Sequence, residues 1–414
     1  MRLAVAILAV VLATQAAAAA EGRIFHADPA AGAVGNDGSA ARPWPALAEA
    51  AQAGLLSRLR AGDTVLLRSG RHGAVTLSGD NAGMVTIAAA KGQTPQLARL
   101  VLTRGSQWTF SGLSISPTFG QPYDGNIVQL GEGGPSHDVV LEGCYIHSTT
   151  DTSSWTTEMW MKANSGILMG RHGTRITVRG NHVLNTRFGL NLCCAEGLVE
   201  GNIISDFSAD GMRITRDGAV VQYNVVKNCY VSSGDGDKNH DDAIQCFLFN
   251  KGTGTVRDVT VRGNVLVNRE DPGQRFPASM QGIGFFDGPL IGFTIAGNVV
   301  VSAAWHGIAL YDAQGCTISG NSVQTQPGSG KTRAWIMLGS KPKVGGASGN
   351  TVTGNQAAAF KLGDDKTVSA DRNVAVSDAA FGSAMQAALA EIAKRFGAKH
   401  AVSGAPLLAG PLLH

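Results

Sequence analysis

The middle of the chain repeats one short motif, and this repeat limits what the chain can fold into. The matching segments are ITVRGNHVLN, GLVEGNIISD, AVVQYNVVKN, VTVRGNVLVN, FTIAGNVVVS and CTISGNSVQT. They place asparagine in one column at Asn181, Asn202, Asn224, Asn264, Asn298 and Asn321, at intervals of 21, 22, 40, 34 and 23 residues. The short intervals match one coil of a β-solenoid, and we interpret the long ones as coils with loop insertions. Asparagine tolerates left-handed backbone geometry and can bond its own turn, so we expect it at a repeated corner.

A second motif occurs once in each coil. Its copies are SGILM, FGLNL, DGMRI, DAIQC, QGIGF and HGIAL, and they alternate apolar and other residues with a period of two. This indicates two short strands per coil. An antiparallel sandwich would not keep one corner at a fixed period. We therefore predict an all-β, single-stranded, right-handed parallel β-helix over residues 71–376, and the glycine content (54 residues) suits its many turns.

Both ends of the solenoid are predicted to carry capping helices. WPALAEAAQAGLLSRLR, residues 44–60, has helical spacing and precedes the strand TVLLRSG. We therefore assign 21–70 to an N-terminal cap region. AAFGSAMQAALAEIAKRF, residues 379–396, is a second amphipathic segment, so 377–414 should be a C-terminal helix and tail, folded on the far end or along a side. Such covers protect the exposed edges of terminal repeats.

The first twenty residues have the layout of a secretory signal peptide. Arg2 precedes an apolar run, and the segment ends in small residues before Glu21. We expect export to the periplasm or beyond the cell, with no membrane span elsewhere. A net charge of +3 permits an acidic ligand and argues against nucleic acid as the partner. The six cysteines do not have the paired spacing of a metal site, and we expect several of them to be small buried hydrophobic residues. We expect the protein to be a monomer.

Stacked coils about 4.8 Å apart bring equivalent residues together. The apolar positions should point inward: Ile167, Leu190, Met212, Ile244, Ile283 and Ile308. The residues between them should point outward, which gives Asn191, Arg213 and Gln245 on three successive coils. At the preceding corner the column contains Asp210, Asp242, Gln281 and His306. The sequence therefore predicts one polar cluster across several coils.

Two insertions occur next to this cluster. The first, GDGDKNHDDAIQCF at 234–247, brings Lys238, His240 and Asp241 to it, and the second includes REDPGQRFPASMQ at 269–281. Loops on a rigid scaffold are common places for function. We expect the two loops and the polar strand face to form a groove.

The aspartate-rich insertion is also a candidate cation site. Asp235, Asp237, Asn239 and Asp241 alternate like the oxygen ligands of calcium loops. The expected central glycine is replaced by His240 and no closing glutamate follows, so only an irregular calcium site remains open. Zinc held by His240 and His306 would lack an evident third ligand.

Two sets of motifs carry a family resemblance. GNDGSAARPW at 35–44 and GDTVLLRSG at 62–70 resemble the exported β-helix proteins of the pectate-lyase superfamily. RHGTRITVRGN at 171–181, followed by DGMRI at 210–214, resembles the alginate lyase and chondroitinase B-like polysaccharide lyases. The resemblance implies that Arg171 acts in catalysis and that Arg213 contacts the substrate.

The chemistry of the cluster suits β-elimination from a uronate. Arg213, Gln245 and Asn191 can hold the acid group, with Gln281 and Lys238 as further substrate contacts. His240 is the favoured base and His306 the other candidate, because imidazole titrates near neutral pH. Asp210, Asp241 and Asp242 would be acid/base partners or cation ligands. The sequence thus predicts an exported lyase for an acidic polysaccharide.

Three other functions stay open at this point. Asp210 and Asp242 lie on adjacent coils, so their carboxyl groups could be about 5 Å apart and act as the pair of a glycoside hydrolase. Epimerisation at C5 needs nearly the same groups as lysis. A non-catalytic polysaccharide-binding β-helix is the third alternative, although such arrays tend to be more regular than this one.

Overall fold

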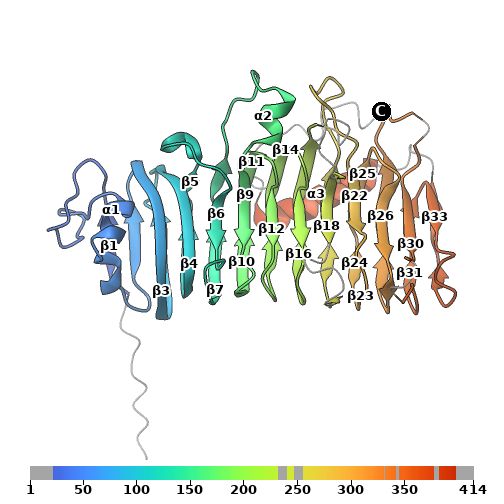
Figure 1. Cartoon of the computed structure of the whole chain (residues 1–414), viewed down its shortest axis with the longest axis horizontal. Coiled ribbons are helices and arrows are strands. Elements are labelled where there is room, and N and C mark those ends of the chain that lie inside the picture. The colour runs from blue at the N-terminus through green and yellow to red at the C-terminus, as the bar shows by residue number, and fades with distance from the viewer. Residues whose placement is uncertain are drawn as a thin grey trace, which may run out of the picture.

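The protein is a long solenoid of parallel strands with a few short helices (Figure 1). The computed structural model describes residues 22–231, 240–246, 255–330, 332–341, 345–376 and 382–397. The predicted calcium ligands Asp235, Asp237 and Asn239 lie outside these ranges, and so does the predicted substrate contact Lys238. No helix in the described ranges is long and apolar enough to cross a membrane.

Each complete coil contains three strands, one on each of three faces. The first face consists of β6 (Asn126–Leu130), β9 (Ser165–Met169), β12 (Leu190–Leu192), β15 (Met212–Ile214), β18 (Asp242–Cys246), β22 (Gln281–Phe285), β26 (His306–Tyr311), β30 (Trp335–Gly339) and β33 (Ala359–Lys361). The second face consists of β7 (Ser136–Glu142), β10 (Gly173–Arg179), β13 (Leu198–Glu200), β16 (Val220–Gln222), β20 (Thr260–Arg262), β24 (Thr294–Ala296), β28 (Thr317–Ser319), β31 (Thr351–Thr353) and β34 (Ser369–Asp371). The third face consists of β5 (Ser114–Ile115), β8 (Tyr145–His147), β11 (His182–Thr186), β14 (Ile203–Phe207), β17 (Val225–Cys229), β21 (Val265–Val267), β25 (Val299–Ser302), β29 (Ser322–Thr325), β32 (Gln356–Ala357) and β35 (Val374–Ala375).

The first coils are built differently from the rest. β1 (Ile24–Ala27) and β2 (Thr64–Leu67) pair with one another and lead into two long strands, β3 (Gly70–Ala89) and β4 (Pro95–Ser111). A small separate sheet of β19 (Val256–Arg257), β23 (Leu290–Ile291) and β27 (Ala313–Gln314) lies beside the later coils. All the registered strand pairs are parallel, as the predicted parallel β-helix requires.

The prediction of two strands per coil was wrong, because the asparagine motif contains two strands. In VTVRGNVLVN, β20 ends at Arg262 and β21 begins at Val265, with the corner at Gly263–Asn264 between them. Gly263 has a φ of 63°, which turns the chain sharply. Inward Val261 and inward Leu266 are five residues apart, so the alternation changes phase at this corner, and the outward Val265 and Val267 hide that change because they are apolar as well.

The asparagine column is a buried ladder of hydrogen bonds. Asn224 Nδ2 donates to the carbonyl of Val199 (3.0 Å) and to Asn264 Oδ1 (3.0 Å), and its own Oδ1 accepts the backbone N–H of Asn202 (2.9 Å). The residue before each asparagine, such as Tyr223 with a φ of 56°, takes the left-handed geometry that the sequence analysis gave to asparagine itself. The asparagine instead satisfies backbone groups that the corner would leave buried and unpaired.

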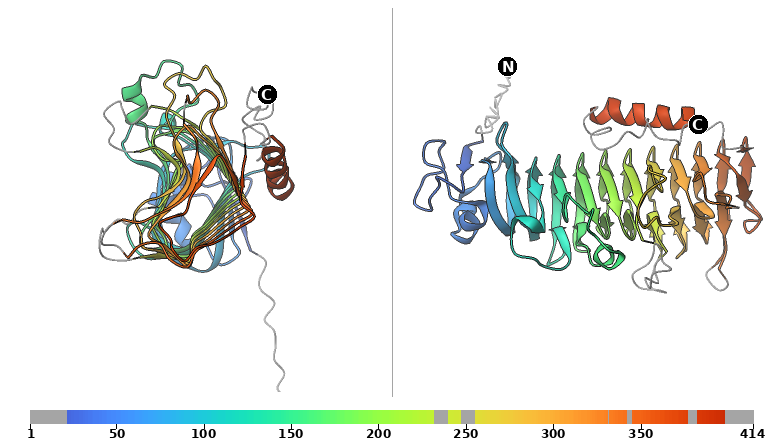
Figure 2. Two further views of the ribbon diagram at one scale, coloured as in Figure 1. Left: turned by 90° about the vertical axis from the view of Figure 1, so that its right-hand side faces the viewer. Right: turned by 90° about the horizontal axis from the view of Figure 1, so that it is seen from above.

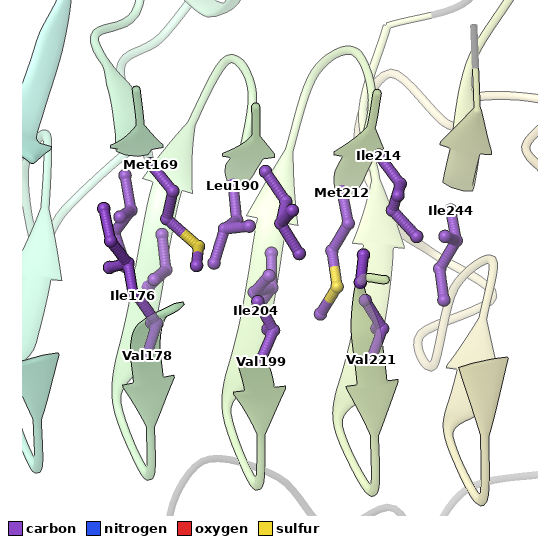
Figure 3. Packing of buried hydrophobic residues seen from close by; sticks show 14 of the residues in the cluster. Met169, Ile176, Val178, Leu190, Val199, Ile204, Met212, Ile214, Val221 and Ile244 are labelled. Atoms are coloured by element: carbon purple, nitrogen blue, oxygen red, sulfur yellow. The ribbon is translucent and has the colours of Figure 1, made fainter. Parts of the chain in front are cut away.

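The core is a narrow column inside the coils. The predicted inward residues are fully or almost fully buried, and in the register Ile167, Leu190, Met212, Ile244, Ile283 and Ile308 follow one another from coil to coil. Figure 3 shows how Leu190, Met212 and Ile244 stack against residues of the other faces such as Val199 and Val221. Parallel stacking thus fixes which side chains point outward on the first face.

Helices cover the first coil and one side of the solenoid. α1 (Leu47–Gln52), followed by the 3₁₀ turn Leu55–Arg58, buries Leu47, Ala50 and Leu55 at the N-terminal end. α3 (Gly382–Phe396) lies along the third face and does not cap the far end (Figure 2). Its Met385, Leu389 and Ile392 pack on the outward valines of that face, among them Val225 and Val265. Of the two positions that the sequence left open for this helix, the structure shows the one along a side.

Candidate active site

The predicted polar residues lie next to one another on the first face. In the register, Asn191 is opposite Arg213, Arg213 is opposite Gln245, and Asp242 is opposite Gln281. His306 occupies the next coil, and its Nδ1 lies 2.5 Å from Gln281 Oε1. These side chains come from β12, β15, β18, β22 and β26 or from the corners before them.

A buried ion pair forms the floor of the site. Arg213 Nε donates to Asp210 Oδ2 at 2.5 Å, and Asp210 Oδ1 accepts the backbone N–H of Asp242 at 3.0 Å. The Asp210 carboxylate is completely buried, and the Arg213 guanidinium lies 3.9 Å from the ring centroid of Phe188. The pair therefore fixes the guanidinium on the first face.

The second pair brings His240 to the same place. His240 Nδ1 lies 2.6 Å from Asp242 Oδ2, and Gln245 Nε2 donates to that oxygen at 3.1 Å. Asp242 is 0% exposed, whereas the His240 side chain is 49% exposed. A buried carboxylate thus holds one imidazole nitrogen while the ring itself faces solvent.

The other carboxyl oxygen of Asp242, Oδ1, has room only because residue 284 is a glycine. Asp242 Oδ1 is buried and has no hydrogen-bond partner. It occupies the space that a Cβ atom on Gly284 would fill, and the same Cβ would press on the ring of Phe286. Gly284 follows Gln245 in the outward column, so the glycine makes room for the His240–Asp242 pair.

Burial has the largest effect on the pKa of both buried carboxyl groups, Asp210 and Asp242. It raises the pKa of Asp242 to about 7, against the opposing effect of its hydrogen bond to His240. Burial also raises the pKa of Asp210, although Arg213 opposes this. The hydrogen bond to Asp242 raises the pKa of His240, and burial lowers the pKa of His306. Such perturbed groups are typical of functional sites.

Aromatic residues that the sequence analysis did not single out complete the site. The ring of Phe286 meets His240 edge-on with centroids 4.9 Å apart, and it also contacts His306 (5.2 Å) and Tyr311 (5.6 Å). The period-two pattern could have revealed Phe286, because inward Ile283 and Phe285 require an outward residue at 286.

Three insertions, not two, gather on the flank beside the corner column. The third is the segment at 148–164 with α2 (Thr157–Met161), which is visible above the first face in Figure 1. Arg275, in the loop at 268–280, donates to the carbonyls of Ser153 and Trp155. Trp160 stacks on Tyr230 with centroids 4.3 Å apart. These contacts join the segment at 148–164 to the loop at 268–280 and to Tyr230, directly after β17.

Arg171 lies apart from this cluster. It follows the end of β9, three coils before β18, and its guanidinium pairs with Glu132 (Nη2–Oε1, 2.6 Å). Three coil steps alone separate it from Asp242 by about 14 Å. The structure therefore does not bring Arg171 to the residues that the sequence placed in the same reaction.

The proposed calcium ligands give no cation site in the described residues. Of the four, only Asp241 is described, and it is buried. Within the described ranges, no three His, Cys, Asp or Glu side chains are grouped as a metal ion would need.

A family model agrees with this architecture. Residues 165–357 match the model described as a right-handed β-helix region. The chain is a right-handed parallel β-helix protein. The matched region contains the coils that carry all the described site residues on the first face. No curated protein sequence matches the chain.

Solved structures similar to this β-helix protein have several activities. A pectate lyase is 14% identical, with 86% of this chain and 82% of that chain covered and a TM-score of 0.45. A mannuronan C-5 epimerase module of Azotobacter vinelandii is 12% identical, with 80% and 94% covered and a TM-score of 0.47. A lacto-N-biosidase from Eubacterium ramulus is 14% identical, with 86% and 68% covered and a TM-score of 0.44. At such identities the likeness concerns the fold alone.

Proposed function

We propose that this β-helix protein is a polysaccharide lyase that cleaves a uronate-containing polymer by β-elimination. The observation that carries the proposal is the His240–Asp242 pair, in which a buried carboxylate holds the Nδ1 of a half-exposed imidazole. An imidazole held in this way presents its other nitrogen, Nε2, as a general base. A polysaccharide substrate also agrees with the activities of the similar solved structures.

His240 takes the proton from C5 of the uronate in this mechanism. The His240 Nδ1–H donates to Asp242, so the neutral ring is in the tautomer whose Nε2 has a free lone pair. The C5–H electron pair forms the C4–C5 double bond, and the C4–O bond breaks. The departing oxygen takes its proton from solvent or from the imidazolium. Asp242 stabilises the imidazolium that forms.

The substrate carboxylate lies on the polar column. Arg213 supplies a positive charge whose position Asp210 fixes, and the amides of Gln245 and Asn191 lie on the coils beside it. Hydrogen bonds to that carboxylate lower the pKa of the C5 proton by stabilising the negative charge that develops. Gln281 holds the imidazole of His306, which is the second candidate base, and Lys238 remains a predicted substrate contact.

The geometry counts against hydrolysis by two carboxylates. Asp210 and Asp242 are both 0% exposed, and Asp210 is bonded to Arg213 and to a backbone N–H. A hydrolase needs both carboxyl groups at the sugar. Epimerisation at C5 uses the same proton abstraction, so it is the second candidate, supported by the same His240–Asp242 pair.

The test measures product from the mature protein on alginate, pectate, glucuronan and chondroitin sulfate. Ultraviolet absorbance of the unsaturated product and new reducing ends should rise together, with and without a calcium chelator as separate arms. Reducing ends without absorbance would show hydrolysis, and C5 inversion without chain cleavage would show an epimerase. N-terminal sequencing of the exported protein tests the predicted removal of residues 1–20.

A matched pair of variants tests the base. His240→Gln should reduce kcat/KM by about 10²- to 10⁴-fold, the usual contribution of a general base. His137 offers the control, because its Nδ1 lies 2.8 Å from Asp138 Oδ2 in an exposed pair on another face. His137→Gln should leave kcat/KM unchanged. Equal activity of His240→Gln and the unaltered protein would exclude His240 as the base.

A further inference from the structure

A row of aromatic rings extends from His240 toward the C-terminal coils. We name it the aromatic strip; its members are Phe286, His306, Tyr311, Trp335 and Trp305. His306 lies 5.6 Å from Trp335 between ring centroids, and Trp335 stacks on Trp305 at 5.1 Å and 28°. The strip is therefore continuous from the proposed base to Trp305.

The strip follows the solenoid axis. Its members come from β22, β26 and β30 or from the residues directly beside these strands, which succeed one another along the molecule in Figure 1. The outward positions between the rings are the small residues Gly284 and Ala309, and Ala309 is completely buried beneath its neighbours. The strip thus forms a shallow apolar surface that advances by one coil at a time.

Two features of the far end point to a ligand. Trp305 is one of the few large apolar side chains that stay exposed (47%). Lys361, on the following coil, holds its ammonium 3.4 Å from the ring centroid of Trp335. Among the described residues, no carboxylate pairs with Lys361. An exposed ring near a positive charge that has no carboxylate partner among the described residues suits a sugar that carries an acid group.

We propose that Trp305 and Lys361 form a distal subsite for an anionic sugar unit of the substrate, with Trp305 stacking on the ring and Lys361 pairing with the carboxylate. The assignment of this subsite to the substrate of His240 rests on the proposed function. The polymer would run along the solenoid axis from His240 over the aromatic strip.

The spacing of the fold supports this direction. Four coil steps of about 4.8 Å separate β18, which carries the base partner Asp242, from β33, which ends at Lys361. A pyranose unit of a polymer is about as long as one such step. Successive sugars can therefore lie over successive coils. Trp305 precedes β26, two coil steps from β18, and Lys361 lies four steps away, so the two would contact a sugar unit beyond the bond that breaks.

The experiment measures binding separately from turnover. Native gels containing alginate or pectate retard a protein that binds the polymer, and hydroxyethyl cellulose serves as the neutral polymer. Trp305→Ala and Lys361→Gln should each weaken retardation by about tenfold, and the effect of Lys361→Gln should shrink at high salt. Lys366→Gln is the control, because Lys366 is an exposed lysine five residues away that bonds only to the Gly363 carbonyl.

The outcomes separate this inference from the proposed function. His240→Gln should be retarded like the unaltered protein, since the distal subsite does not include the base. Retardation that Trp305→Ala leaves unchanged would overturn the inference even if unsaturated product forms. If Trp305→Ala loses retardation but the unaltered protein forms no product from any polymer, the distal subsite is supported and the proposed lyase activity is overturned. Equal retardation by the neutral polymer, or none by either anionic polymer, would also overturn the inference.

Discussion

At the scale of single residues, the proposed function depends on a buried carboxylate beside a half-exposed imidazole. Asp242 is placed by the strand register, by the amide of Gln245 and by the space over Gly284. Burial of a charged group is expensive, so this pair should lower the stability of the folded state relative to an uncharged one.

The pH dependence of turnover follows from the direction of the His240 shift. The hydrogen bond to Asp242 raises the pKa of His240, and the base must be neutral to accept a proton. We expect kcat/KM to rise with pH, with its midpoint above the ordinary histidine value of 6.5. In Asp242→Asn the raising contact is lost, so the midpoint should move to lower pH and the plateau should fall by about tenfold or more. An unmoved midpoint would show that another group titrates.

Asp242 should make the free energy of unfolding fall as pH rises, whereas most carboxylates in folded proteins make it rise. Its folded pKa is raised to about 7 from 3.8, so between these values the unfolded chain loses its proton first. The folded state therefore loses stability as pH rises through this window, by up to about 4 kcal/mol, and protonated His240 offsets part of the loss.

The variant Asp242→Asn should remove this loss. Its free energy of unfolding, measured in urea, should therefore rise relative to the unaltered protein as pH increases from about 5 to 8. Asp138→Asn is the control, and its difference from the unaltered protein should stay constant over this range. Hydrogen bonds from Arg175 and His137 lower the pKa of Asp138 to about 2, so its contribution is present above pH 4 and is lost below that. A parallel response of the two variants would contradict the assignment.

Gly284→Ala tests whether the glycine positions Asp242. The added Cβ would overlap Asp242 Oδ1 and the Phe286 ring, so the His240–Asp242 pair should be displaced. We expect kcat/KM to fall by about tenfold or more while secondary structure, followed by circular dichroism, is retained. Gly363→Ala is the matched control, because nothing lies within 4 Å of the added atom. Full activity of Gly284→Ala would show that Asp242 can move without loss.

At the scale of elements, the asparagine ladder connects the second and third faces. Each inner asparagine pairs with the next coil and with a buried carbonyl, as Asn224 does with Asn264 and Val199. The ladder continues beyond the predicted column to Asn355 and Asn373. It makes the corner of one coil depend on the coils beside it.

Asn224→Ala should therefore be far more damaging than the same change at the open end of the ladder. It leaves the buried backbone N–H of Asn202 without its acceptor, which we expect to lower the free energy of unfolding by about 2–4 kcal/mol. Asn373→Ala removes a partly exposed member and should lower it by less than about 1 kcal/mol. Urea unfolding measures both. Equal losses would mean that burial of the ladder is unimportant.

The prediction of elements succeeded where the pattern was local. The strands of the first face follow directly from alternation, and the apolar column is found where it was expected. The third strand per coil was missed because β21 is apolar on both sides, so the change of phase at Gly263–Asn264 is hidden in the apolar run Val265–Val267. The sequence left two positions open for α3, because its amphipathic pattern shows that the helix covers an apolar surface and does not show which one.

At the scale of the whole molecule, the stack of coils holds the chain together without disulfide bonds. The six cysteines are free and buried, at positions 144, 193, 194, 229, 246 and 316. This confirms the expectation that several of them behave as small hydrophobic residues. Burial raises the pKa of all six thiols, so they should be poor nucleophiles in the folded state.

Thiol titration checks this arrangement. In the native protein a thiol reagent should react with almost none of the six groups, and in denaturant with all of them. A reductant should leave Tm unchanged, because there is no bridge to break. A Tm that falls on reduction would reveal a disulfide and contradict the structure.

The sequence by itself determined the coil, the corner and the outward column, because parallel stacking turns a repeat in the chain into a row in space. It therefore predicted that Asp210, Arg213, Asp242 and Gln245 lie together. Only the tertiary structure decided that Asp242 holds His240, that α3 covers the third face, and that the segment at 148–164 contacts the loop at 268–280. These contacts depend on side-chain directions and on how insertions fold back over the coils, and neither is periodic in the sequence.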